Sequence, residues 1–170
     1  MPANSGIRLF LCQMKMELWQ IGKTAFPFLE AGIAEYEKRL KRYIPFELIT
    51  IPDIRKGGKL PMEQLMEKEG QAVLARLDTS DYLILLDEQG KQYRSIDFAQ
   101  YLEALQHQSH RKVVLLIGGA YGFSGEVRHR ANHLISLSKM TFSHQMVRLF
   151  ILEQLYRAQT ILRNEPYHHE

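Results

Sequence analysis

The chain has 170 residues, of which 45% are hydrophobic and 24% charged, with a mean hydropathy of −0.26, as is typical of a single soluble domain. Its net charge of +3 and isoelectric point near 9.0 permit an anionic partner without requiring one. The single cysteine, Cys12, excludes an internal disulfide and a zinc site of several cysteines, and no apolar run is long enough to span a bilayer, so we expect a cytoplasmic protein.

Residues 1–13 show no clear period and precede two further methionines, Met14 and Met16. We interpret residues 1–13 as an N-terminal extension and assign residues 14–170 to the single domain. The alternative is that residues 1–13 form an extra strand.

From residue 17 onward, predicted strands and helices alternate along the chain. The predicted strands cover residues 17–21, 46–51, 82–86 and 113–117, with a shorter strand that begins at His133. The predicted helices cover residues 26–44, 61–77, 95–106, 126–131 and 146–163, with Ser95 as the N-cap of the third. We expect residues 52–59 and 87–90 to be loops. The alternation predicts an α/β domain with a mostly parallel sheet flanked by helices.

The last predicted helix carries more apolar surface than one sheet face can cover. One stripe at helical spacing consists of Val147, Ile151, Leu155, Ala158 and Leu162. A second stripe consists of Met146, Leu149, Phe150, Leu152 and Tyr156. Because one sheet supplies only one partner surface, we expect the second stripe to contact another copy of the chain in a homodimer.

Three strand ends carry loops suited to ligand binding, since ligands of open α/β sheets bind beyond the carboxyl ends of the strands. These loops are residues 86–90, 117–122 and 137–142. Gly118 and Gly119 allow a ligand to approach the main chain closely. The motif GGAYG is neither GxGxxG nor a Walker loop, so a dinucleotide site or a phosphate-binding loop is disfavoured. A purely structural role for the two glycines is the alternative.

The seven histidines form no metal-binding pattern such as HExxH, so we expect no metal site. The serines form no GxSxG elbow and Cys12 lies in the expected extension, which leaves nucleophilic catalysis without a candidate. His168 and His169 are either functional, as ligands or a general base, or part of a solvated tail.

Basic residues cluster in two parts of the sequence. The first cluster spans residues 38–59 and includes Arg55, Lys56 and Lys59. The second cluster lies near the later loops and includes Arg128, Arg130, Arg148, Arg157 and Arg163. Cationic side chains beside a ligand loop suit contact with RNA phosphates, and the alternative is a solvated helix face.

Three segments resemble a known family, the SPOUT-type large-subunit rRNA methyltransferases called RlmH. These segments are LLIGGAYGFS at 115–124, SLSKMTFSHQMVRLFILEQLYRA at 136–158 and NEPYHHE at 164–170. Weaker similarities are WQIGK at 19–23, GIAEYEKRL at 32–40 and EKEGQ at 67–71. The resemblance extends from about residue 14 to the end of the chain and omits residues 1–13.

The resemblance implies a SPOUT fold with a C-terminal trefoil knot, an obligate homodimer through the last helix, and S-adenosylmethionine as methyl donor. It implies methylation at N3 of a pseudouridine in large-subunit (23S-type) rRNA, as free rRNA or in the assembled ribosome. The residues that it assigns to the cofactor are Leu86, Gly118, Gly119, Leu137, Ser138, Lys139, Met140, Thr141 and Phe142. The family's chains end in Tyr-His-Arg or Tyr-His-Lys, whereas here His169 follows Tyr167 and His168, a departure that bears on the tail's charge toward RNA.

Under this resemblance, we expect Tyr167 and His168 to close over the cofactor, with His168 as acceptor of the imide proton. The residues expected to bind RNA are Arg55, Lys56, Lys59, Arg148 and Arg157. Arg148 and Arg157 are equally suited to a salt bridge in the dimer. Two alternative functions are a non-enzymatic RNA-binding factor in ribosome assembly and a SPOUT methyltransferase that acts on tRNA.

Overall fold

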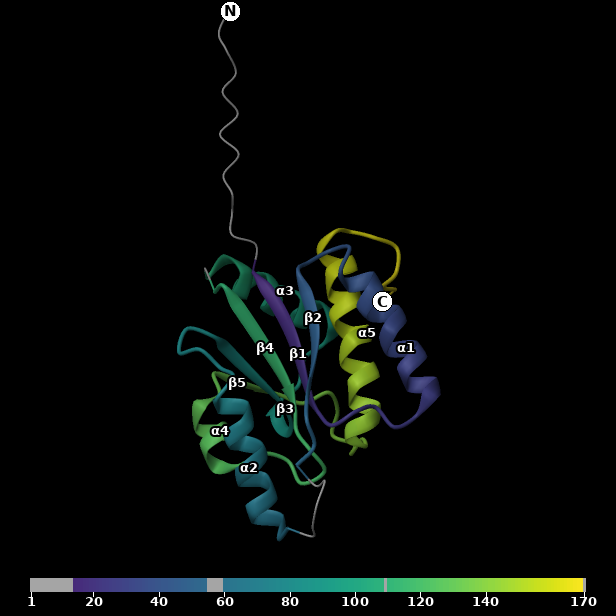
Figure 1. Ribbon diagram of the computed structural model, residues 1–170. Coiled ribbons are helices and arrows are strands. Elements are labelled where there is room, and N and C mark those ends of the chain that lie inside the picture. The colour runs from purple at the N-terminus through teal and green to yellow at the C-terminus, as the bar shows by residue number, and fades with distance from the viewer. Residues whose placement is uncertain (1–13, 55–59, 109, 170) are drawn as a thin grey trace, which may run out of the picture.

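A five-stranded parallel sheet forms the centre of the computed structural model, which describes residues 14–54, 60–108 and 110–169 (Figure 1). The strands are β1 (Lys15–Ile21), β2 (Phe46–Ile51), β3 (Tyr82–Lys91), β4 (Lys112–Ile117) and β5 (His133–Ile135). Their order is β2-β1-β4-β3-β5, and every neighbouring pair is parallel. The predicted α/β class is therefore confirmed, whereas the trefoil knot stays a prediction. The expected extension, residues 1–13, lies outside the described residues.

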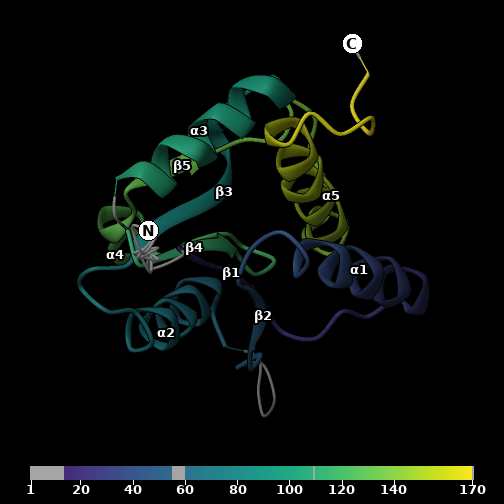
Figure 2. The same ribbon diagram turned by 90° about the horizontal axis from the view of Figure 1, so that it is seen from above.

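Helices cover both faces of the sheet (Figure 2). They are α1 (Pro27–Leu40), α2 (Met62–Leu74), α3 (Ser95–His107), α4 (Gly125–Arg130) and α5 (His144–Leu162). One buried cluster joins the sheet to α1, α3 and α5, and a second joins the other face to α2 and α4. The central strands β1 and β4 are buried on both faces, which explains the almost continuously apolar sequence of β4, whereas β1 also buries Glu17 and Gln20. Among the described residues, no helix is both long and apolar enough to cross a membrane.

Two local predictions about the chain after residue 82 are wrong. Residues 87–90 were expected as a loop but belong to β3, because Ile135 pairs with both Leu86 and Lys91 and the residues between them bulge from the ladder. Ser95 is the first residue of α3 rather than its N-cap, a position that Arg94 occupies. The Ser95 hydroxyl instead donates a hydrogen bond to Gln154 Oε1 of α5 at 3.2 Å.

Helix α5 lies between α1 and α3 on one face of the sheet, and this placement covers most of its second apolar stripe. Leu152 is fully buried, and Leu149 packs so closely on α1 that a Cβ at Gly32 would lie 2.9 Å from Leu149 Cδ1. Tyr156 packs against Tyr36 of α1, with ring centroids 5.9 Å apart. The stripe was expected to need a second copy of the chain, but α1 supplies most of the missing partner surface.

We expect Gly90→Ala to destabilise the fold. A Cβ at Gly90 would lie 2.5 Å from backbone atoms of Ile135, and backbone cannot yield as a flexible side chain can. The free energy of unfolding, measured by chemical denaturation, should fall by about 1–3 kcal/mol. Gly125→Ala is the matched control, since nothing lies within 4 Å of its Cβ position, and its effect should stay within about 1 kcal/mol. Equal stability of the two variants would contradict this close approach of β3 to β5.

Candidate functional site

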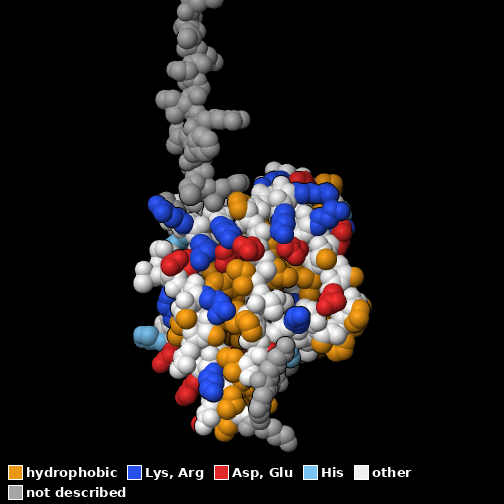
Figure 3. All heavy atoms as spheres, viewed as in Figure 1, with side chains coloured by type: hydrophobic (Ala, Val, Ile, Leu, Met, Phe, Trp, Pro, Cys, Tyr) orange, Lys and Arg blue, Asp and Glu red, His pale blue; other side chains and the backbone are white. Residues whose placement is uncertain are grey.

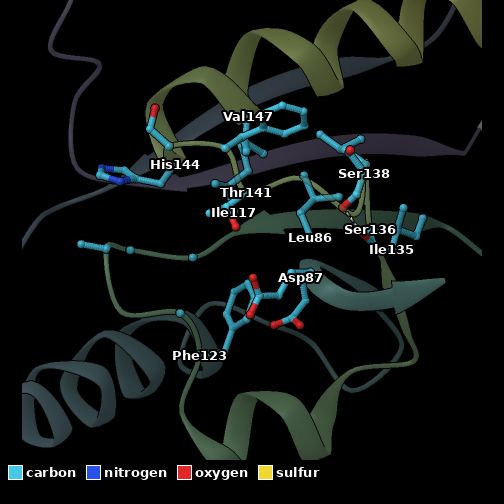
Figure 4. Close-up of a pocket in the computed structure, with 18 of the residues that line it drawn as sticks. Leu86, Asp87, Ile117, Phe123, Ile135, Ser136, Ser138, Thr141, His144 and Val147 are labelled. Carbon is cyan, nitrogen blue, oxygen red and sulfur yellow. Dashed lines mark hydrogen bonds between the residues drawn. The ribbon is translucent and has the colours of Figure 1, made fainter. Parts of the chain in front are cut away.

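The carboxyl ends of β3, β4 and β5 meet around a cavity of about 470 Å³ (Figure 4). The strand register places Leu86 between Ile117 on β4 and Ile135 on β5, and all three residues line the cavity. The first turn of α5 closes the cavity with His144 and Val147. The cavity therefore lies where open parallel sheets bind their ligands.

The glycine-rich segment 118–122 forms a tight turn on the cavity wall. The Gly122 amide donates a hydrogen bond to Gly119 O at 3.2 Å, and the φ of Gly122 is +84°, in the left-handed region that favours glycine. A Cβ at Gly119 would lie 2.6 Å from Oε2 of Glu69, which is buried on α2. A Cβ at Gly118 would lie 3.2 Å from Gly122 O. The space at both glycines is thus tight, and both present bare main chain to the cavity.

The loop that follows β5 is held by its own serine side chains. Ser136 Oγ donates to Ser138 O at 2.8 Å, and Ser138 Oγ accepts from the Met140 amide at 3.0 Å. Ser143 then caps α5 by accepting from the Met146 amide at 3.3 Å. These hydrogen bonds hold the loop that forms this wall of the cavity.

All but one of the residues expected at the cofactor line this cavity. The lining residues among them are Leu86, Gly118, Gly119, Leu137, Ser138, Met140, Thr141 and Phe142. The exception is Lys139, whose side chain is exposed. The structure thus brings together three loops that are widely separated in the sequence, while their role in binding the cofactor stays a prediction.

An ion pair that sequence reasoning missed lies on the opposite wall. Asp87 Oδ2 accepts from Arg128 Nη2 at 2.6 Å, and Asp87 Oδ1 accepts from the Gln89 amide at 2.9 Å. Figure 4 shows Asp87 and Phe123 on one side of the cavity and Thr141 with Val147 on the other. Asp87 and Arg128 are 41 residues apart, so no local sequence signal connects them. Val147 also lines the cavity, whereas its place in an apolar stripe of the last helix predicted only a packing role.

The C-terminal residues Tyr167 and His168 do not close over the cavity of their own chain. Tyr167 donates a hydrogen bond to Glu153 Oε1 at 3.1 Å and contacts Tyr36 Oη at 3.2 Å, and His168 Nδ1 lies 3.4 Å from Arg157 Nη1. Burial raises the pKa of Tyr167 above its usual value. Because Arg157 is about 15 Å along the helix axis from the cavity-lining turn of α5, the tail packs on another part of the domain.

Arg148 was expected to contact RNA or a dimer partner but is 1% exposed. Its Nη2 donates to Ile21 O at 2.8 Å and its Nη1 donates to Thr24 Oγ1 at 3.1 Å. Gln145 holds the same segment, since its Oε1 accepts from the Ala25 amide at 2.9 Å. Burial lowers the pKa of the Arg148 guanidinium. In this position Arg148 anchors the end of β1 and the segment after it to α5. Its buried guanidinium is not accessible to an RNA phosphate.

Of the other cations expected to bind RNA, Arg157 is the one that the structure describes, and it does not line the cavity. Arg157 pairs with Glu153 one turn earlier on α5, and its guanidinium lies 4.7 Å from the ring centroid of Tyr167. Arg55, Lys56 and Lys59 lie outside the described residues. In the part of the chain that the structure describes, no group of three or more His, Cys, Asp or Glu side chains could hold a metal ion.

Basic side chains gather over the amino-terminal ends of the strands, with acidic side chains among them (Figure 3). Lys15 lies 2.6 Å from Glu47, and Lys41 lies 2.7 Å from Glu37. These ion pairs neutralise much of the positive charge at this end of the molecule. The helix face formed by residues 38–42 therefore fits a solvated surface better than an RNA-binding one.

Comparison with known proteins identifies the family of the chain and agrees with the fold. Residues 14–168 match the family model described as "Predicted SPOUT methyltransferase", so the chain belongs to the SPOUT methyltransferase family. Its relatives include three proteins named Ribosomal RNA large subunit methyltransferase H. Those of Parabacteroides distasonis and Cytophaga hutchinsonii are each 52% identical, and that of Porphyromonas gingivalis is 49% identical. Each alignment covers 92% of this chain and 100% of the relative.

We expect Arg148→Met to destabilise the domain, because it removes both hydrogen bonds to the segment after β1 while keeping most of the side-chain volume. The free energy of unfolding should fall by about 1–3 kcal/mol in chemical denaturation. Arg76→Met serves as control, since Arg76 lies just after α2, is exposed, and its side chain donates to the nearby Ala72 O; its effect should stay within about 0.5 kcal/mol. If Arg148→Met were as stable as Arg76→Met, the anchoring role of Arg148 would be wrong.

Proposed function

We propose that this protein transfers a methyl group from S-adenosylmethionine to N3 of a pseudouridine in large-subunit rRNA, in the cytoplasm. The cavity at three strand ends carries this proposal, because nearly all residues assigned to the cofactor by family resemblance line it. Relatives about half identical over their whole length are named as large-subunit rRNA methyltransferases, which supports rRNA as the substrate.

The cavity fits the proposed methyl donor in shape and chemistry. Leu86, Ile117 and Ile135 form an apolar wall of a kind that accepts a flat base such as adenine. The bare main chain at Gly118 and Gly119 offers amide and carbonyl groups for the polar edge of that base. Ser138 and Thr141 add polar side chains to the lining. An apolar wall with polar main-chain and hydroxyl groups beside it suits a nucleoside that carries a polar chain.

Leu86, Gly118, Gly119 and residues 137–142 would hold S-adenosylmethionine, which would supply an electrophilic methyl carbon to N3, with sulfur keeping the electron pair of the broken S–C bond. The protein's task is to align the two reactants and to accept the proton that N3 loses. Tyr167 and His168 stay the proposed catalytic residues. Since they pack away from the cavity of their own chain, they can act only at the cavity of another subunit.

A homodimer interface on the surface beside the cavity explains why four phenylalanine side chains are exposed in the single chain. Phe26 and Phe28 at the start of α1 are 48% and 66% exposed, and Phe142 and Phe150 are each 37% exposed. The bond from the Ala25 amide to Gln145 places the start of α1 beside the start of α5. Phe142 also lines the cavity and packs on Phe150, with ring centroids 5.0 Å apart. A second copy that covers these rings would therefore lie next to the cavity.

We expect calorimetric titration to detect S-adenosylmethionine binding to the wild-type protein. Val147→Trp should weaken binding by about tenfold or more, because the added ring occupies the cavity that Val147 lines. Leu162→Trp, on the same stripe of α5 but at its far end, should bind like wild type. Absence of wild-type binding at millimolar ligand would instead favour a non-enzymatic RNA-binding factor.

We expect His168→Ala to lower the methylation rate by about 100-fold or more, as loss of a general base does. The substrate should be ribosomes purified from a strain that lacks this protein, with methylated nucleosides identified by mass spectrometry. His169→Ala is the control, since His169 is exposed and should leave the rate unchanged. An unchanged rate in His168→Ala would remove His168 from the chemistry, and a mark found in tRNA rather than rRNA would correct the substrate.

A further inference from the structure

Tyr121 is an exposed aromatic residue on the wall of the cavity. Its side chain is 52% exposed, yet the turn that carries it is tightly held by the Gly119–Gly122 pairing and by the buried ring of Phe123. A large ring that stays in water although its backbone is fixed has a surface available for a ligand. Because the turn is already ordered, covering this ring would cost little conformational entropy.

Arg128 is held beside this turn by the carboxylate of Asp87. The guanidinium carbon lies 5.9 Å from the ring centroid of Phe123, two residues after Tyr121, and the side chain is 37% exposed. The Asp87 side chain is only 6% exposed, so the ion pair has a buried acidic end and a basic end toward solvent. A guanidinium carries five N–H donors in a fixed fork, so an arginine oriented by one carboxylate can still bind a second anion.

A ring and a guanidinium that line the same cavity match the two parts of a nucleotide in single-stranded RNA. Unstacked bases pack on aromatic side chains, and arginine binds the phosphates. Glu88, also exposed on this wall, disfavours a phosphate on its own side and leaves the side of Arg128. The methyl donor's nucleoside is expected beside Leu86, Gly118, Gly119 and residues 137–142, which leaves Tyr121 and Arg128 for the RNA.

We propose that Tyr121 and Arg128 form the docking site for the target nucleotide, with the Tyr121 ring stacked on an RNA base and Arg128 on a neighbouring phosphate. The inference rests on the proposed function, since it needs an RNA substrate at this cavity. The inference assigns the side of the cavity that carries Leu86 and Val147 to the methyl donor. It assigns the side that carries Asp87 to the RNA. Tyr121 is then a residue that positions the nucleotide, without taking part in the proton transfer.

The experiment compares Tyr121→Ala, Tyr121→Phe and Arg128→Gln with wild type. Arg76→Gln is the control, because it removes the same charge from an exposed residue just after the carboxyl end of α2. The substrate is ribosomal large subunits from a strain that lacks this protein, at fixed magnesium and between 50 and 200 mM added salt. For each variant, four quantities are measured: the S-adenosylmethionine dissociation constant, the KM for the subunits, kcat, and the thermal midpoint without ligand.

Tyr121→Ala should raise KM for the subunits by about tenfold, the size of one base–aromatic stack, at every salt concentration. Tyr121→Phe should behave like wild type, because it keeps the stacking ring. Arg128→Gln should raise KM for the subunits, which reports weaker RNA binding. It should also reduce the slope of log(1/KM) against log salt by about 0.7, as expected for one lost phosphate contact. Arg76→Gln should change neither quantity, and all variants should keep the wild-type affinity for S-adenosylmethionine.

An unchanged KM in Tyr121→Ala would overturn the stacking role. If Arg128→Gln weakened S-adenosylmethionine binding instead of RNA binding, Arg128 would belong to the methyl donor's site and the assignment of walls would be wrong. Failure of the wild-type protein to bind S-adenosylmethionine or to methylate the subunits would refute the proposed function itself. Wild-type binding and methylation are therefore measured before any variant is compared.

Discussion

The register of β3 between β4 and β5 is the constraint on which the cavity depends. Leu86 pairs with Ile117 on one side and Ile135 on the other, so three strands end their pairing at one level. A shift of one residue in this register would exchange the faces of the sheet to which the side chains point. It would also move Asp87 away from Arg128, which is fixed separately on α4. The register is secured by the apolar residues of β3 and β4, which are buried on both faces.

Helix α5 connects this cavity to the rest of the core. Its middle packs between α1 and α3, where Gly32 allows Leu149 to approach α1 closely. Its first turn has two functions, because His144 and Val147 line the cavity while Gln145 and Arg148 hold the segment that follows β1. Nearly all sides of the first two turns of α5 thus either line the cavity or contact other parts of the same chain. The apolar surface left for a partner is concentrated in the few exposed phenylalanines near this end.

The sequence predicted the sheet well because buried parallel strands are nearly continuous apolar runs, as at 82–86 and 113–117. The position of the cavity followed from the rule that ligands bind at the carboxyl ends of such strands. Periodicity could not say which neighbour covers an apolar stripe, and the partner of Leu149 proved to be α1 rather than a second chain. A pattern that treats arginine as polar could not reveal that Arg148 is buried. The pairing of Asp87 with Arg128 depends on tertiary structure alone, and the proposed chemistry came from resemblance to a family.

The double role of the first turn of α5 has a thermodynamic consequence. A ligand that binds only the native cavity stabilises every element whose local unfolding would destroy that cavity. Because Gln145 and Arg148 join the same turn to residues 21–25, opening of that segment removes support from the cavity wall. Ligand binding is thereby linked to the local stability of the connection between β1 and α1. Backbone amides in that connection should exchange with solvent more slowly when the cavity is filled, although none of residues 21–25 is among those that line it.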